Sequence, residues 1–188
     1  MQNGVMTIAY EGEITCQLHV WVPLEDPVKL FWLSLQNTSQ TPQEFGLSFL
    51  ASFVMGEGNE AEKMNMHFHW EGGALLFENS LNEKSRTGFM AMDLPADGKD
   101  GSYVSEEIFY TTDYLTCIQQ IGQGKMAMPW QNHSPGNGGN FMGMLQKTWV
   151  LKPGEETSVF LCLGVEKNSE EVMALLHRYR QQNSQEPE

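Results

Sequence analysis

The stretch PWQNHSPGNGGNF, residues 129–141, contains the side chains best suited to contact a ligand. Trp130 offers an aromatic platform. Gln131, Asn132 and His133 add amide and imidazole groups beside a glycine-rich loop. Such a mixture binds sugars, because an aromatic ring covers the apolar face of a pyranose while planar amides bond to its hydroxyls. An ordinary long loop whose glycines permit positive φ is the competing interpretation. These four residues are the candidate carbohydrate contacts of the sequence.

His67 and His69 in MHFHW occupy alternate positions, so on a strand both project from one face, as two ligands of a metal ion would. The spacing does not indicate a third ligand among the 24 acidic residues and the other histidines. The pattern therefore favours a polar strand face. We expect no metal site and no cofactor.

The acidic residues gather in short segments such as EGE, EGNEAE, SEE and GEE, which have the composition of turns or of a helix N-terminus. Solvated charge is the usual reason for such segments. No GxSxG elbow singles out a nucleophilic serine. We therefore assign no catalytic residue, and the chain alone is not expected to be an enzyme.

Charge and hydropathy exclude two classes of partner. A formal net charge of −13 repels a nucleic acid backbone and an anionic membrane surface. No apolar run approaches the length of about 20 residues that a membrane-spanning helix needs, and the N-terminus has no basic segment typical of a signal peptide. We expect a cytoplasmic protein. We therefore interpret its three widely separated cysteines as reduced residues of the core: Cys16, Cys117 and Cys162.

The hydrophobic pattern predicts strands along most of the chain. Residues 14–22 alternate strictly between apolar and polar positions, and residues 28–37 are apolar on both faces, as in a central strand covered on both sides. The further predicted strands are 44–55, 67–78, 87–93, 103–110, 114–121, 144–151 and 157–163. Short strands separated by turn-forming segments, without room for helical crossovers, predict an all-β antiparallel sandwich.

The C-terminal part gives the clearest local signals. The segment KPGEE at 152–156 has the chemistry of a tight turn and predicts a hairpin between the last two strands. A helix is predicted over 169–182, where apolar residues recur at helical spacing after a capping Asn168 or Ser169. Acidic residues in its first turn and Arg178 and Arg180 in its last turn suit the helix dipole. Residues 184–188 are polar and are predicted to form a frayed tail.

Several of these segments, in this order, resemble the sandwich domain of the glycoside hydrolase family 94 phosphorylases, formerly glycosyltransferase family 36. That family includes cellobiose phosphorylase, chitobiose phosphorylase and the phosphorylase-like part of cyclic β-1,2-glucan synthase. The pieces are VPLEDPV, LSLQNTSQTP, and LQKTWVLKPGEETSVFLCLG followed by a helix that ends in LLHRYR. GGALLF and GFMAMDL are weaker matches. The resemblance covers most of the chain, and its motifs are structural.

The resemblance implies a supersandwich fold like that of galactose mutarotase, with one C-terminal helix. Residues 1–166 would form the sandwich, without upstream strands that relatives carry, and residues 167–183 a linker helix. The intact parent would cleave a β-glucosidic bond with phosphate, by inversion. Its general acid would be an Asp on a separate (α/α)6 barrel, so the chain would support that barrel, a homodimer interface or an active-site rim.

Two other functions stay open at this point. A stand-alone carbohydrate-binding module would use the Trp130 to His133 segment and would bind β-glucan oligosaccharides by itself. A mutarotase-type sugar epimerase would need a histidine base and a carboxylic acid, which no motif in the sequence places. A sandwich that lacks strands also presents unpaired edges, so we expect the isolated chain to dimerise or aggregate.

Overall fold

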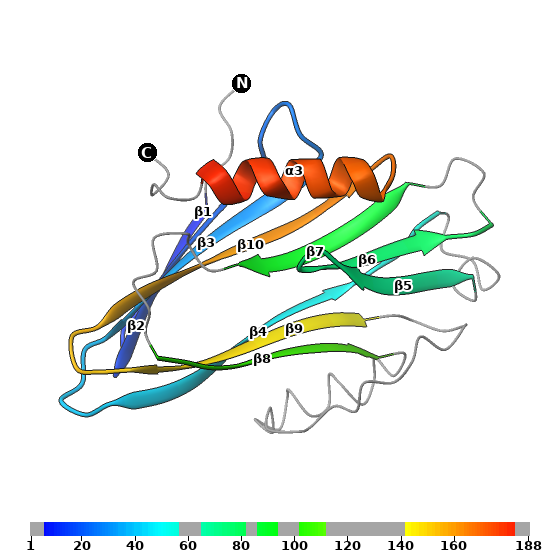
Figure 1. The fold of residues 1–188 in the computed structure, drawn as a ribbon. Helices are drawn as coiled ribbons and strands as arrows, with labels where there is room; N and C mark the ends of the chain where they lie inside the picture. The colour runs from blue at the N-terminus through cyan, green and yellow to red at the C-terminus, as the bar shows by residue number, and fades with distance from the viewer. Residues whose placement is uncertain (1–5, 57–64, 82–85, 94–101, 112–141, 183–188) are drawn as a thin grey trace.

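The computed structural model describes residues 6–56, 65–81, 86–93, 102–111 and 142–182, and these residues form two antiparallel sheets and a C-terminal helix (Figure 1). The seven-stranded sheet has the order β1 (Met6–Tyr10), β2 (Ile14–Trp21), β3 (Val28–Asn37), β10 (Glu156–Glu166), β7 (Thr87–Asp93), β6 (Ala74–Asn79) and β5 (Met66–Glu71). The three-stranded sheet has the order β4 (Gln43–Ser52), β9 (Met142–Leu151) and β8 (Ser102–Thr111). Helix α3 spans Ser169–Gln182. The predicted antiparallel sandwich with a C-terminal helix is confirmed.

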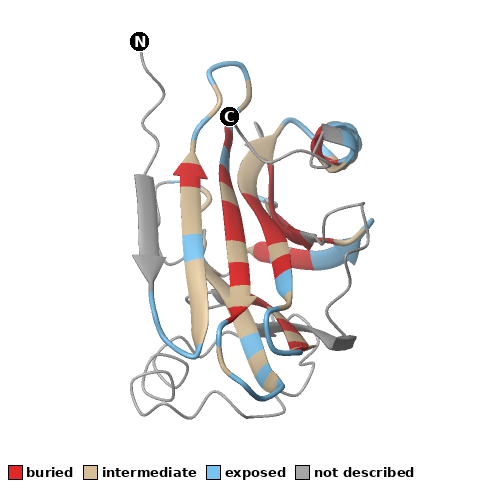
Figure 2. Cartoon of the chain, turned by 90° about the vertical axis from the view of Figure 1, so that its left-hand side faces the viewer, coloured by how far each residue is buried: buried red, intermediate tan, exposed pale blue. Residues whose placement is uncertain are grey.

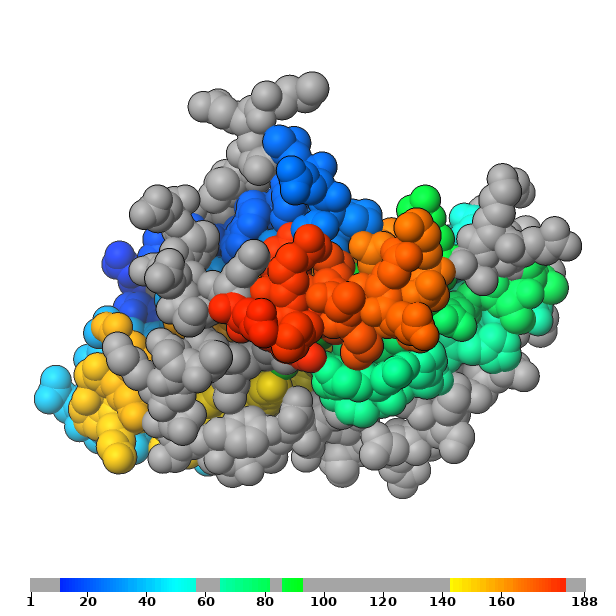
Figure 3. Space-filling model, turned by 45° about the horizontal axis from the view of Figure 1, so that its top comes forward, coloured from blue at the N-terminus to red at the C-terminus, as the bar shows by residue number. Residues whose placement is uncertain are grey.

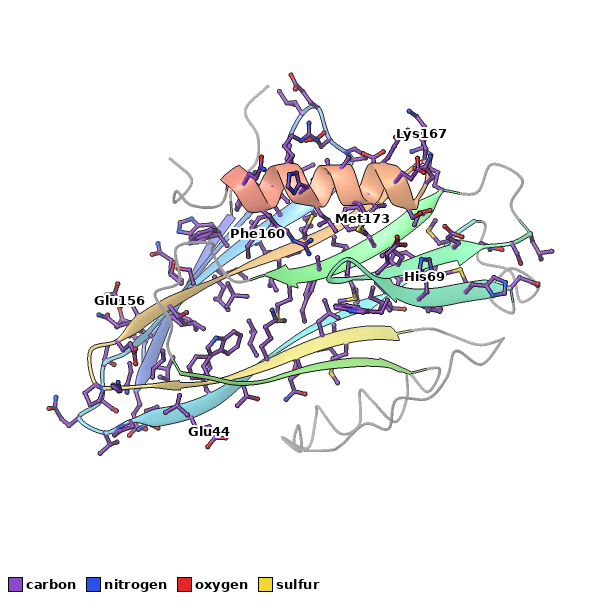
Figure 4. All side chains as sticks on the ribbon, in the orientation of Figure 1. Glu44, His69, Glu156, Phe160, Lys167 and Met173 are labelled. Atoms are coloured by element: carbon purple, nitrogen blue, oxygen red, sulfur yellow. The ribbon has the colours of Figure 1, made fainter. Side chains whose placement is uncertain are left out.

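Two apolar layers lie on opposite faces of the seven-stranded sheet. The inner layer, between the sheets, includes Leu33, Phe77, Trp149 and Leu161. The outer layer lies between the seven-stranded sheet and α3, and Figure 4 shows Phe160 and Met173 there. Strand β3 contributes to both layers, which confirms the prediction that residues 28–37 are covered on both faces. Figure 2 shows the buried residues concentrated along the middle strands and on the side of α3 that faces the sheet.

The glycines that matter most sit where large side chains need the space of a missing Cβ. A Cβ on Gly143 of β9 would approach side-chain atoms of Met90, Leu75 and Phe53 to within 2.9 Å. Because Gly143 faces the other sheet, it lets the two sheets come close at this end of the sandwich. In the same way, the ring of Phe77 occupies the space that a Cβ on Gly88 of β7 would need.

The last two strands do not form the predicted hairpin. The turn itself is present, with Gly154 at φ 77° and the Glu155 amide donating to the Lys152 carbonyl at 3.0 Å. However, β9 belongs to the three-stranded sheet and β10 to the seven-stranded sheet. The apolar faces of these strands pack against each other in the inner layer, so the connection crosses between the sheets and the strands share no ladder. The hairpin prediction was wrong because turn chemistry fixes a reversal of the chain but not its bonding partners.

Residues 67–78, predicted as one strand, form two. Gly72 and Gly73, at φ 56° and 81°, make a two-residue turn between β5 and β6. Consecutive positive φ values are the geometry of a type I′ hairpin turn. Strand β1 was also missed by the sequence pattern, and the predicted strand 114–121 lies outside the described residues.

Asn37 joins two of the connections that run between the sheets, the one from β3 to β4 and the one from β9 to β10. Its side-chain amide donates to the carbonyls of Thr41 and Leu151, both at 2.8 Å. Its Oδ1 atom accepts from the backbone amide of Ser39 at 2.9 Å. Its backbone carbonyl accepts from the amide of Gly154 at 2.8 Å. One buried side chain therefore holds the segment after β3 against the turn between β9 and β10.

Candidate functional sites

The proposed sugar contacts Trp130, Gln131, Asn132 and His133 lie outside the described residues. Cys117 lies outside them as well. Of the other cysteines, Cys16 packs in the inner layer and Cys162 is buried in the outer layer.

The two histidines of β5 lie on one face of the strand, as predicted, and both are exposed. His67 Nε2 lies 3.1 Å from the Ser80 hydroxyl, and His69 Nε2 lies 3.4 Å from Glu71 Oε2. In the part of the chain that the structure describes, no three His, Cys, Asp or Glu side chains come together as metal ligands would. No helix in this part has the length and apolarity needed to cross a membrane.

A group of polar side chains fixes α3 to the β2–β3 loop, residues 22–27. Asp26 Oδ1 accepts a hydrogen bond from Arg178 Nη2 at 2.7 Å. Asp26 Oδ2 accepts one from the Tyr179 hydroxyl at 2.6 Å. Figure 3 shows this loop packed directly against the helix. We call these three residues the Asp26 clamp.

Burial, together with the hydrogen bond to Asp26, raises the pKa of the Tyr179 hydroxyl well above its ordinary value. The ring of Tyr179 packs in the outer layer, with its centroid 6.2 Å from that of Phe160. The hydroxyl therefore stays protonated and donates to the carboxylate at every physiological pH. Tyr179 thus holds α3 in place both through the packing of its ring and through the hydrogen bond of its hydroxyl.

A second contact holds the other side of α3 to the hairpin turn between β5 and β6. Arg180 donates from Nη1 to the Gly72 carbonyl at 2.7 Å and from Nη2 to the Gly73 carbonyl at 3.3 Å. Met173 packs so closely against Gly72 that an added Cβ would lie 2.3 Å from its sulfur. At the other end Asn168 caps the helix, because its Oδ1 accepts from the Glu171 amide at 2.9 Å. The predicted cap at Asn168 is confirmed.

Sequence reasoning used VPLEDPV as a segment that resembles a family, and LLHRYR as part of that resemblance and as the last turns of the predicted helix. It did not predict that Asp26 in the first bonds to Arg178 and Tyr179 in the second. The signal was a pair of acids, Glu25 and Asp26, in a proline-bounded loop, together with a Tyr that continues the apolar face of the helix next to an Arg. Pairing them requires knowing that α3 returns to lie across β3.

We expect Tyr179→Phe to lower the free energy of unfolding by about 1–2 kcal/mol near pH 7, because it removes one hydrogen bond to a charged acceptor and keeps the ring. The raised pKa predicts a pH dependence. The pKa of a tyrosine in the unfolded chain is about 10, and below this pH the hydroxyl contributes fully to stability. As pH rises further this contribution is lost, because the hydroxyl then ionises only in the unfolded state.

Urea unfolding of both proteins from pH 7 to 11 measures this difference. Lys167→Ala, which removes an exposed ion pair with Glu171, is the matched control and should cost less than about 0.5 kcal/mol. A stability difference between the native protein and Tyr179→Phe that does not change up to pH 11 would contradict the role given to the hydroxyl.

These features define a class of protein: a β-sandwich domain that carries a C-terminal helix clamped across its larger sheet. The family model described as "Glycosyl hydrolase 94, supersandwich domain" matches residues 6–182. The chain therefore belongs to the supersandwich domain family of glycosyl hydrolase 94. The resemblance inferred from the sequence is confirmed.

Solved structures similar to this chain include the following two. One is a protein from the human microbiome assigned as a kojibiose phosphorylase, with 11% identity and a TM-score of 0.48 over 96% of this chain and 21% of that one. The other is a protein from Klebsiella pneumoniae subsp. pneumoniae assigned as an aldose 1-epimerase, with 11% identity and a TM-score of 0.38 over 99% of this chain and 55% of that one. The chain thus spans about a fifth of the first protein and about half of the second. No curated protein matches it.

Proposed function

We propose that this chain is the non-catalytic sandwich domain of an inverting glycoside phosphorylase that acts on β-glucosides. The observation that carries the proposal is the family match, which takes in every described strand and helix α3. The proposed partner is the catalytic (α/α)6 barrel of the parent enzyme, which would supply the general acid and the phosphate site. Homodimeric association through the sandwich is a further part of the proposal.

The rigid attachment of α3 supports this role. A domain that positions a barrel needs a connection whose direction is fixed relative to its core. The Asp26 clamp on one side and the Arg180 contacts on the other hold the C-terminal half of α3 at two separate places on the sheet. The sandwich would therefore set the position of a barrel joined at this helix.

Trp130, Gln131, Asn132 and His133 are proposed as sugar contacts at the rim of the barrel's active site. Isothermal titration of the chain with short β-linked gluco-oligosaccharides tests this assignment. Binding that is lost in Trp130→Ala would support direct contact, and binding that is unchanged in this variant would remove Trp130 from the site.

A domain exchange tests the supporting role. Residues 6–182 replace the sandwich of an active family phosphorylase, and phosphorolysis is measured for the chimaera with Asp26 intact and with Asp26→Ala. We expect activity in the first and a reduction of at least about tenfold in the second, since loss of the clamp frees the helix. Lys167→Ala in the same chimaera is the control. Equal activity with and without Asp26 would contradict the role given to the clamp.

A further inference from the structure

Met173 and Arg180 hold α3 to the β5–β6 turn from the same face of the helix, about two helical turns apart. Met173 occupies the space that the missing Cβ of Gly72 leaves. Its Sδ, Cε and Cγ atoms all lie within 3.8 Å of the position that this Cβ would take. Arg180 donates to the carbonyls of Gly72 and Gly73. The thioether therefore contacts the same turn as the hydrogen bonds that fix this side of α3.

Met173 is also within reach of solvent, unlike the methionines of the core. Met66, Met90, Met92 and Met144 have at most 3% of their surface accessible. Met173 is only partly buried against the outer layer, where Figure 4 shows it on the side of α3 that faces the sheet. A dissolved oxidant must reach the sulfur in order to react with it. Met173 is therefore open to oxidation while these four methionines are protected.

We propose that Met173 is a redox-sensitive contact, and that its oxidation by hydrogen peroxide releases the C-terminal half of α3 from the β5–β6 turn. The sulfur attacks one oxygen of the peroxide, the O–O bond breaks, and a proton moves to the departing oxygen, which leaves as water. The sulfur loses two electrons and becomes a sulfoxide, and the peroxide gains them. A methionine sulfoxide reductase reverses the step with a dithiol, which becomes a disulfide as the oxygen leaves in water.

The sulfoxide is a poor substitute for the thioether at this contact. It places a polar oxygen on a sulfur that packs against the backbone of the turn, where an apolar side chain fits. That oxygen is also a hydrogen-bond acceptor, so it competes with the Gly72 and Gly73 carbonyls for the guanidinium of Arg180. The Asp26 clamp holds the opposite side of α3 and is unaffected. Oxidation therefore loosens the helix without unfolding the sandwich.

The redox-sensitive contact adds regulation to the proposed function and rests on it in one respect, because a loosened α3 matters only to a domain that is joined at this helix. The tests below measure α3 in the chain alone, without a barrel or a sugar. Their failure would remove the redox-sensitive contact and leave the barrel-supporting role untouched. Loss of that role would leave the chemistry of Met173 as proposed.

Two substitutions separate Met173 from the other methionines. Met173→Leu keeps an apolar side chain of similar volume and removes the sulfur, so α3 should no longer respond to peroxide. Met55→Leu, at another partly buried methionine, which packs in the inner layer, is the matched control and should respond as the native chain does. Met173→Gln places a polar group at the contact and should loosen α3 without peroxide.

Hydrogen exchange of the full chain and of these variants, before and after treatment with hydrogen peroxide, measures the response of α3. In the native chain, mass spectrometry should find sulfoxide at Met173, and the amides of residues 176–182 should exchange at least about fivefold faster. The amides of β3 and β10 should keep their native rates, and the reductase should restore those of α3. Unchanged exchange in α3 of a chain oxidised at Met173 would overturn the proposal, as would a native response in Met173→Leu.

Discussion

Replacing Asn37 by alanine is expected to lower the free energy of unfolding by about 3 kcal/mol, the largest loss from any single polar side chain in the described residues. The substitution removes the amide hydrogen bonds to the carbonyls of Leu151 and Thr41 and the acceptor for Ser39. Each bond contributes about 1 kcal/mol, and the buried carbonyl of Leu151 is left without this donor. Urea unfolding measures the change.

The neighbouring residue offers a matched control for Asn37. Gln36 also donates one side-chain hydrogen bond, to Glu156 at 2.6 Å, but at an exposed position. Gln36→Ala should cost less than about 1 kcal/mol, because water replaces the lost partner. Similar losses for the two variants would show that Asn37 is not the residue that joins the β3–β4 connection to the β9–β10 connection.

Replacing Gly88 by alanine should destabilise the sandwich by a comparable amount, about 3 kcal/mol. The added Cβ would lie 2.0 Å from the ring of Phe77. That ring is buried and stacked on Phe53, with centroids 3.7 Å apart, so it has no free direction in which to move. Overpacking of a filled core costs about 1–3 kcal/mol and more where neighbours are fixed.

A strand glycine where an added Cβ would make only ordinary van der Waals contacts provides the comparison for Gly88. Gly46 on β4 is exposed, and an added Cβ there would meet its nearest atom, Nε2 of Gln146, at 3.4 Å. Gly46→Ala should change the free energy of unfolding by less than about 0.5 kcal/mol. Thermal unfolding of both variants distinguishes a specific clash at Gly88 from a general cost of replacing a strand glycine by alanine.

Local patterns predicted most of the elements of this fold. Period-two alternation located β2, the two-sided apolar run located β3, and the cap at Asn168 with helical spacing located α3. Each of these signals is contained within a few neighbouring residues. The side chains themselves therefore carry the information.

The hairpin error and the missed contacts of α3 arose where distant segments decide the structure. The turn at 152–156 predicted a reversal, but whether β9 and β10 pair depends on β3, β4, β7 and β8, which take their edges. The Asp26 clamp joins residues that are far apart in the chain, so no local pattern announces it. The resemblance to a family predicted the fold, but the contacts that hold α3 could be seen only in the structure.

The central proposal is that this domain supports a phosphorylase barrel and performs no chemistry alone. Its most direct test incubates the purified chain with inorganic phosphate and β-linked gluco-oligosaccharides and measures release of sugar 1-phosphate. The account predicts no release above that of the buffer, at any concentration of the chain. Phosphate-dependent release that scales with the concentration of the chain would contradict it.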